Sequence, residues 1–134
     1  MNDNNKNIFV HEWINKAADD ELSINAILKE SGAPSTACFL SQQMAEKYLK
    51  AFLVFSKKKF PKIHHLEKLL GMCKAIDGEF KELDNEAVLL SEYYIETRYP
   101  GDYPEGFSWD NAKQAYDAAI RIKVFVNERL NVNL

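Results

Sequence analysis

The segment between Ser41 and Leu70 constrains the fold more than any other part of the chain. In its first half, apolar side chains recur every three or four residues, which is the period of an α-helix. These positions are Met44, Tyr48, Ala51 and Phe55. Polar residues occupy the other side, where Glu46 stands four residues before Lys50, and we expect these two to form an exposed ion pair. The segment therefore begins with a long amphipathic helix.

The same segment changes character after residue 56. The consecutive lysines 57–59 are followed by Phe60 and Pro61, which interrupt the helical period, and a second amphipathic run opens at His64. Just before this break, residues 51–55 are apolar on every side of the helix. That composition indicates burial on more than one face, either inside a helical bundle or against a second subunit.

Similar periodicity covers most of the remaining chain and predicts further helices. We expect helices at about residues 9–29, 34–57, 64–76, 85–98 and 109–130. The acidic residues Asp19, Asp20 and Glu21 are expected to face solvent. Residues 1–8 are polar and should form a disordered tail, followed by a single domain from residue 9 to 131. Short connections favour antiparallel neighbours, so the prediction is an all-α, up-and-down bundle of four to five helices.

Composition argues against several classes of protein. The net charge of −3 disfavours a broad nucleic-acid-binding surface. No apolar run approaches the ~18 residues of a membrane-spanning helix, and the polar N-terminus does not resemble a signal peptide. Cys38 and Cys73 lack metal-ligand spacing and are interpreted as buried thiols in a reducing compartment. We therefore expect a cytoplasmic protein with no membrane contact, no metal site and no cofactor.

Candidate binding residues cluster at the breaks in the helical pattern. His64 opens a predicted helix after the lysines, and a helix N-terminus favours anions. Arg98 ends another predicted helix, and the irregular segment that follows contains Tyr99 and Tyr103. Arginine contacts phosphates well, and aromatic rings stack on bases.

These residues are expected to meet at one end of the bundle. The argument assumes that the third helix runs antiparallel to the central helix and that the fourth runs parallel to it. His64 and Arg98 would then lie near Lys50, with Lys47 on the same face of the central helix, and the group would attract a phosphate. The alternative is that neighbouring glutamates neutralise these cations as ordinary surface ion pairs.

Three sequence blocks resemble the HEPN domain family and occur in that family's order. SQQMAEKYLKAFL, which starts at Ser41, is similar to the glutamine–alanine–glutamate–lysine helix of the family. Residues 63–70 resemble its histidine–aspartate–leucine helix start, with His65 where aspartate is common. Residues 97–100 resemble its tyrosine–threonine–arginine–tyrosine–proline block, and Tyr94 lies one turn before them. The resemblance implies a helical bundle, often a homodimer, in a small prokaryotic protein commonly encoded beside a minimal nucleotidyltransferase. It also implies nucleotide binding and a toxin–antitoxin-like pair.

Many HEPN members are metal-independent ribonucleases with an arginine followed, four to six residues later, by a histidine. The chain contains only three arginines, Arg98, Arg121 and Arg129, and all of them follow its last histidine, His65. This ribonuclease motif is therefore absent, and we assign no catalytic residue. A histidine and an arginine from separate helices, His64 and Arg98, could still restore such a pair in space.

Three hypotheses follow for the function. The first is a non-catalytic HEPN module that binds a nucleotide, a nucleotidyltransferase partner or both, through Lys47, Lys50, His64 and Arg98, with Tyr99 or Tyr103 as a stacking face. The second is a metal-independent ribonuclease with a rearranged His64–Arg98 site, although RNA is the less expected ligand. The third is a structural homodimer or adaptor without a ligand. In each case we expect a homodimer.

Overall fold

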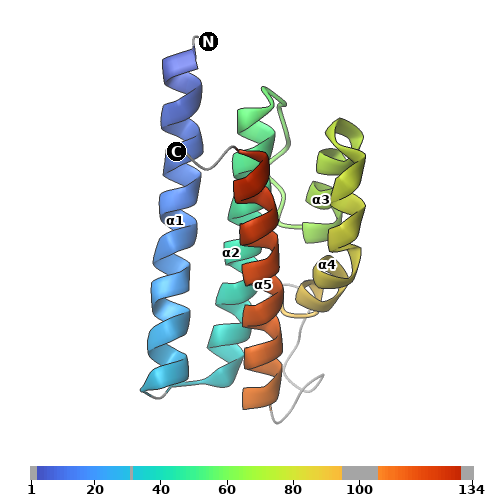
Figure 1. Ribbon diagram of the computed structural model, residues 1–134. Coiled ribbons are helices and arrows are strands. Elements are labelled where there is room, and N and C mark those ends of the chain that lie inside the picture. The colour runs from blue at the N-terminus through green and yellow to red at the C-terminus, as the bar shows by residue number, and fades with distance from the viewer. Residues whose placement is uncertain (1–2, 31, 95–105, 131–134) are drawn as a thin grey trace.

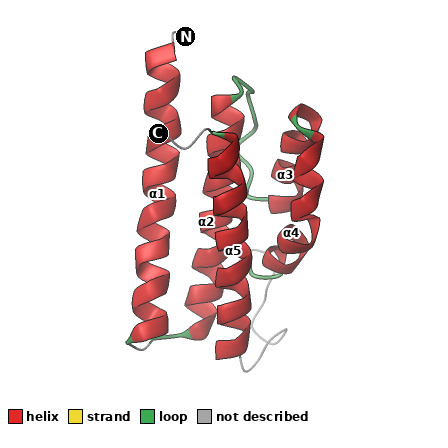
Figure 2. Ribbon diagram, viewed as in Figure 1, coloured by secondary structure: helices red, strands yellow, loops and turns green. Residues whose placement is uncertain are grey.

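The computed structural model describes residues 3–30, 32–94 and 106–130 and shows an all-α bundle (Figures 1 and 2). Its elements are α1 (Asp3–Lys29), α2 (Pro34–Phe55), α3 (Leu66–Ile76), the 3-10 helix η1 (Gly78–Leu83), α4 (Asp84–Ser91) and α5 (Trp109–Arg129). The predicted fold class is confirmed. The boundaries of α2 and α5 lie within about two residues of those that the sequence pattern predicts.

Helix α2 is the centre of the bundle. It packs against α1, α5, α3 and α4, so neighbours surround it on most sides. Ala51, Phe52 and Leu53 are buried within the single chain, and Phe52 contacts Phe80 of η1 with a ring-centroid distance of 4.5 Å. Three residues of the apolar segment are thus buried without a second subunit, whereas Val54 and Phe55 are only partly buried, and the homodimer stays a prediction.

The direction of α3 differs from the prediction. Gln42 of α2 contacts His64 just before α3, whereas the Cys73 thiol within α3 faces the carbonyl of Leu49 at 3.8 Å. Later residues of α3 therefore lie beside later residues of α2, and the two helices run parallel. The expectation of an antiparallel α3 was wrong because the connection of residues 56–65, not the helix, returns along α2 (Figure 1).

Helix α4 also runs in the opposite direction to the one expected. Helices η1 and α4 are consecutive and form one arm. Phe80, at the start of this arm, packs on Phe52 near the end of α2. Tyr93, just past α4, packs edge-on against Phe107 at 4.7 Å, and the Phe107 N–H donates a hydrogen bond to Ser35 at the start of α2. The arm formed by η1 and α4 is therefore antiparallel to α2.

Three element boundaries differ from the prediction. Helix α1 begins at Asp3 and so includes most of the segment for which we expect disorder; the division into a tail and a domain from 9 to 131 stays a prediction. Helix α3 begins at Leu66, because His65 has an extended backbone. Helix α4 ends at Ser91 rather than near residue 98, and the Ser91 hydroxyl donates to the carbonyl of Ala87 at 2.7 Å. Such a side-chain bond competes with continued helix.

Two local features define the start of α5: a capping box and a glycine with positive φ. Ser108 and Asn111 form a reciprocal capping box, in which Ser108 is the N-cap. Gly106 has φ of 72°, and a Cβ there would lie 2.9 Å from the Ser35 hydroxyl oxygen. A glycine is favoured at this close approach between the starts of α2 and α5, because it adopts positive φ at little cost and carries no Cβ. None of the helices in the described part of the chain is both long enough and apolar enough to cross a membrane.

Candidate binding site beside His64

A buried polar stripe runs along α2 and was not predicted. It consists of Gln42, Glu46 and Lys50, which lie one helical turn apart and are 0%, 4% and 5% exposed. We expected Glu46 and Lys50 to form a surface pair. They do form an ion pair at 2.9 Å, but the connection of residues 56–65 and the aromatic ring of Trp13 cover it.

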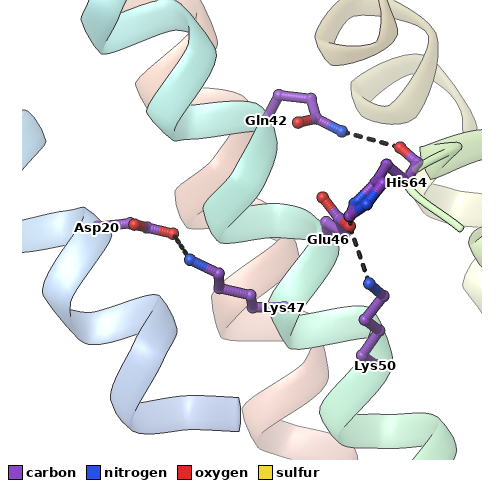
Figure 3. Close-up of polar contacts among 6 residues, drawn as sticks. All are labelled: Asp20, Gln42, Glu46, Lys47, Lys50 and His64. Atoms are coloured by element: carbon purple, nitrogen blue, oxygen red, sulfur yellow. Dashed lines mark hydrogen bonds and ion pairs between the residues drawn. The ribbon is translucent and has the colours of Figure 1, made fainter. Parts of the chain in front are cut away.

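Glu46 is the acceptor at the centre of this stripe (Figure 3). One carboxylate oxygen, Oε1, receives the ammonium group of Lys50 at 2.9 Å and the Nδ1 nitrogen of His64 at 2.5 Å. Gln42 Nε2 donates to the backbone carbonyl of His64 at 3.2 Å. Both the ring and the backbone of His64 are therefore anchored to α2.

Lys50 is enclosed rather than available for a ligand. Its Nζ lies 5.2 Å from the centroid of the Trp13 ring as well as on Glu46. A cation over an indole face is stabilised electrostatically. The charge of Lys50 is thus balanced inside the bundle.

Lys47 serves a different contact, on the α1 side of α2. Its ammonium group pairs with Asp20 at 2.6 Å, and Figure 3 shows it pointing toward α1. Asp20 was expected to face solvent but is only 9% exposed. Burial raises the pKa of this carboxyl above its usual value, although the hydrogen bond and charge of Lys47 oppose the shift. The predicted grouping of Lys47 with Lys50 around one phosphate is therefore not what the described side chains show.

A pocket of about 290 Å³ opens next to His64. Gln42 forms one wall, the start of α3 another, and Ser91 and Tyr94 the third. The rings of His64 and Tyr94 stack at a centroid distance of 5.7 Å and an interplanar angle of 26°. The pocket thus combines an aromatic surface with polar side chains.

The start of α3 adds hydrogen-bond donors to this pocket. Leu66, Glu67 and Lys68 line it, and their backbone N–H groups belong to the first turn of α3. The N-cap residue, His65, makes no side-chain hydrogen bond to that turn. Uncapped N–H groups at a helix start attract anions. The Gln42 Oε1 atom is buried and has no hydrogen-bond partner among the described residues.

Arg98, Tyr99 and Tyr103 lie outside the described residues, so their predicted roles stay predictions. Tyr94, four residues before Arg98, nevertheless stacks on His64. Both α3 and α4 run opposite to the predicted directions. Because both are reversed, the end of the arm formed by η1 and α4 still lies beside the start of α3, as the prediction required.

Within the described ranges, no cluster of three or more histidine, cysteine, aspartate or glutamate side chains is placed to bind a metal.

Comparison with known proteins identifies the family. The HEPN domain model matches residues 10–129. The chain belongs to the HEPN domain family. The crystal structure of an archaeal HEPN homologue is similar to this HEPN chain with a TM-score of 0.74 and 29% sequence identity, covering 90% of this chain and 97% of the homologue. A search of curated proteins finds no match.

Within this HEPN chain, sequence reasoning placed His64 in the site but missed the residues that hold it. Gln42 received no role, Glu46 was assigned to the surface, and Tyr94 was noted only as a neighbour of the arginine block. A usable signal was present in the sequence. Gln42, Glu46 and Lys50 repeat every four residues on a helix whose other faces are largely apolar, which indicates a buried polar stripe.

Proposed function

We propose that this chain is a non-catalytic HEPN module that binds a nucleotide in the pocket beside His64. The observation that carries the proposal is the anchored His64 ring, stacked on Tyr94 at the edge of a pocket that has the start of α3 as one of its walls. Aromatic surfaces stack on bases, and helix N-termini attract phosphates. The volume lies near the lower end of the roughly 300–1,000 Å³ range of small-molecule sites.

The same proposal includes a protein partner. A minimal nucleotidyltransferase, in a toxin–antitoxin-like pair, would present or transfer a nucleotide near the pocket, and a homodimer in the cytoplasm is the expected assembly. The two cysteines support a reducing compartment, because both are buried thiols. Arg98, Tyr99 and Tyr103 follow Tyr94 in the chain and are proposed to complete the site.

Calorimetric titration of the four ribonucleoside monophosphates into the purified chain tests this proposal. We expect at least one to bind, and His64→Ala or Tyr94→Ala to weaken it about tenfold, since each removes an interaction of about 1–1.5 kcal/mol. His11→Ala is the matched control, because His11 is exposed and does not line the pocket. Absence of binding by the wild type at millimolar concentration would overturn the proposal.

One observation favours the ribonuclease as a second candidate. The carboxylate of Glu46 contacts Nδ1 of His64, and histidines that act as general acids or bases are commonly oriented by such a contact. Tyr94 stacks on the same ring, and Arg98 follows Tyr94 by four residues in the sequence. Cleavage of single-stranded RNA by clean wild-type protein, abolished by His64→Ala and by Arg98→Ala in folded variants, would support this candidate. Equal cleavage by His64→Ala would identify a contaminant.

A further inference from the structure

The contact with Glu46 determines which nitrogen of the His64 ring carries a proton. An ionised carboxylate only accepts hydrogen bonds, so the Nδ1 nitrogen, 2.5 Å from Glu46 Oε1, is the donor. The ammonium group of Lys50 already balances the charge of this carboxylate. A neutral His64 ring therefore leaves the three-residue cluster without net charge, with its proton on Nδ1.

The other ring nitrogen, Nε2, is then a hydrogen-bond acceptor. It has no hydrogen-bond partner in the described ranges, and the His64 side chain is 55% exposed while lining the pocket. The ring is held in place, because Gln42 fixes the His64 backbone and Tyr94 stacks on its face. A ligand in the pocket therefore meets a fixed acceptor.

We infer that Glu46 is a positioning residue, and that His64 Nε2 accepts a hydrogen bond from a donor group of the bound nucleotide. The donors that a nucleotide offers at neutral pH are its ribose hydroxyls and the exocyclic or ring N–H groups of its base. His64 thus selects for a sugar hydroxyl or a base N–H. The phosphate is received elsewhere, at the first turn of α3. This inference rests on the proposed nucleotide binding and adds a role for each residue.

The assignment reverses the prediction made from the sequence, in which His64 and the lysines together receive a phosphate. Lys50 is paired with Glu46, and Lys47 is paired with Asp20 on the other side of α2. If either lysine turned toward a ligand, it would leave a buried carboxylate without its counter-charge, which is energetically costly. Lys68, which is exposed and lines the pocket, is the described lysine best placed to meet a phosphate.

The first test is the tautomer of His64 in the protein without ligand. Long-range proton–nitrogen NMR spectra of the uniformly ¹⁵N-labelled chain at neutral pH distinguish the two ring nitrogens. We expect the Nδ1–H form for His64, and a mixture of tautomers in Glu46→Gln, whose amide can donate as well as accept. Exposed His11 provides the reference signal. A predominant Nε2–H form or a doubly protonated ring in the wild type would overturn the inference.

The second test measures which ligand group meets the ring. The tightest-binding ribonucleoside monophosphate is compared with analogues that lack the 2′-hydroxyl, the 3′-hydroxyl or one N–H donor of the base. We expect one of these deletions to weaken binding to the wild type about tenfold and to have no effect on His64→Ala, because the lost partner is already missing there. Glu46→Gln should reduce the same discrimination without changing the response to phosphate removal.

The outcomes separate the inference from the proposed function. If a nucleotide binds but every analogue loses affinity equally in the wild type and in His64→Ala, nucleotide binding stands and the role of His64 is wrong. If no nucleotide binds, both are wrong. Should Glu46→Gln fail to fold, Glu46→Leu/Lys50→Met removes the carboxylate together with the buried cation, and the same two measurements apply to it.

Discussion

Replacing Glu46 by alanine should destabilise the fold strongly, because it leaves the Lys50 ammonium group buried without a counter-charge. The two side chains are only 5% and 7% exposed, and Trp13 covers the cation from the other side. Removing one member of a buried ion pair typically costs about 3–5 kcal/mol. Glu46→Ala also releases Nδ1 of His64, but that ring is half exposed and can bind water instead. We therefore expect a loss close to 4 kcal/mol.

Urea denaturation followed by circular dichroism measures this loss. With a denaturant dependence of about 2 kcal/mol per molar, the midpoint should fall by about 2 M. The matched control is Lys74→Met, because Lys74 pairs with Asp84 at the surface with a side chain that is 36% exposed. Such an exposed pair contributes about 0–1 kcal/mol, so its midpoint should move by less than about 0.5 M.

A second variant separates the unpaired charge from the lost packing. Glu46→Leu/Lys50→Met removes both charges and keeps similar volume, and such replacements are often neutral or stabilising. We expect its stability to lie within about 1 kcal/mol of the wild type. A single variant as stable as the wild type would refute the burial of the pair. A double variant as unstable as the single one would show that the cost does not come from the unpaired Lys50.

Three further predictions concern the bundle itself. Phe80→Ala should cost about 3–5 kcal/mol in urea denaturation, because Phe80 is 0% exposed and packs between two other aromatic rings. Gly106→Ala should lower the free energy of unfolding by about 1–2 kcal/mol, because alanine is strained at this positive φ. Gly78→Ala should change stability little, because the added Cβ would meet open space. Equal effects of the two substitutions would contradict this geometry. Burial raises the pKa of the Cys73 thiol to about 12, so a thiol reagent at pH 8 should modify it only after unfolding; rapid modification of the native chain would refute its burial.

Most of the fold followed from hydrophobic periodicity in the sequence. Helix α5 was predicted well because its apolar side chains recur at helical spacing and Ser108 marks its start. Helix α2 was predicted for the same reason, with Pro34 in its first turn. Periodicity identifies a helix and the face it buries, so elements with a clear stripe and a clear cap are placed correctly.

Helix direction could not be predicted in the same way. The connection of residues 56–65 was treated as an ordinary turn, but an extended chain covers about 3.3 Å per residue and a helix only about 1.5 Å. Those residues are therefore able to return along much of α2 before α3 begins. Lys57 adopts φ of 60° at the point where the chain leaves α2. Nothing in the hydrophobic pattern of α3 depends on whether it runs up or down.

The site was predicted in part because its residue types were recognised without their surroundings. His64 was selected as a polar residue near a helix start, and that neighbourhood is correct. Glu46 was assigned to solvent because one apolar face was assumed to be the whole buried surface in the part of α2 that precedes residue 51. A central helix has neighbours on several sides, so polarity at Glu46 indicates a buried partner there rather than exposure.

The buried stripe of α2 connects the fold to the proposed site. If the Glu46–Lys50 pair contributed only to stability, leucine and methionine at these positions would stabilise the fold equally well. A buried ion pair rarely stabilises a protein more than apolar residues of similar volume. The carboxylate does something that leucine cannot, which is to accept the Nδ1 hydrogen of His64. Lys50 then supplies the counter-charge of this buried carboxylate. On this argument Glu46→Leu/Lys50→Met should remain folded and lose the single tautomer of His64. A double variant that keeps the Nδ1–H form would show that the stripe and the ring are not coupled.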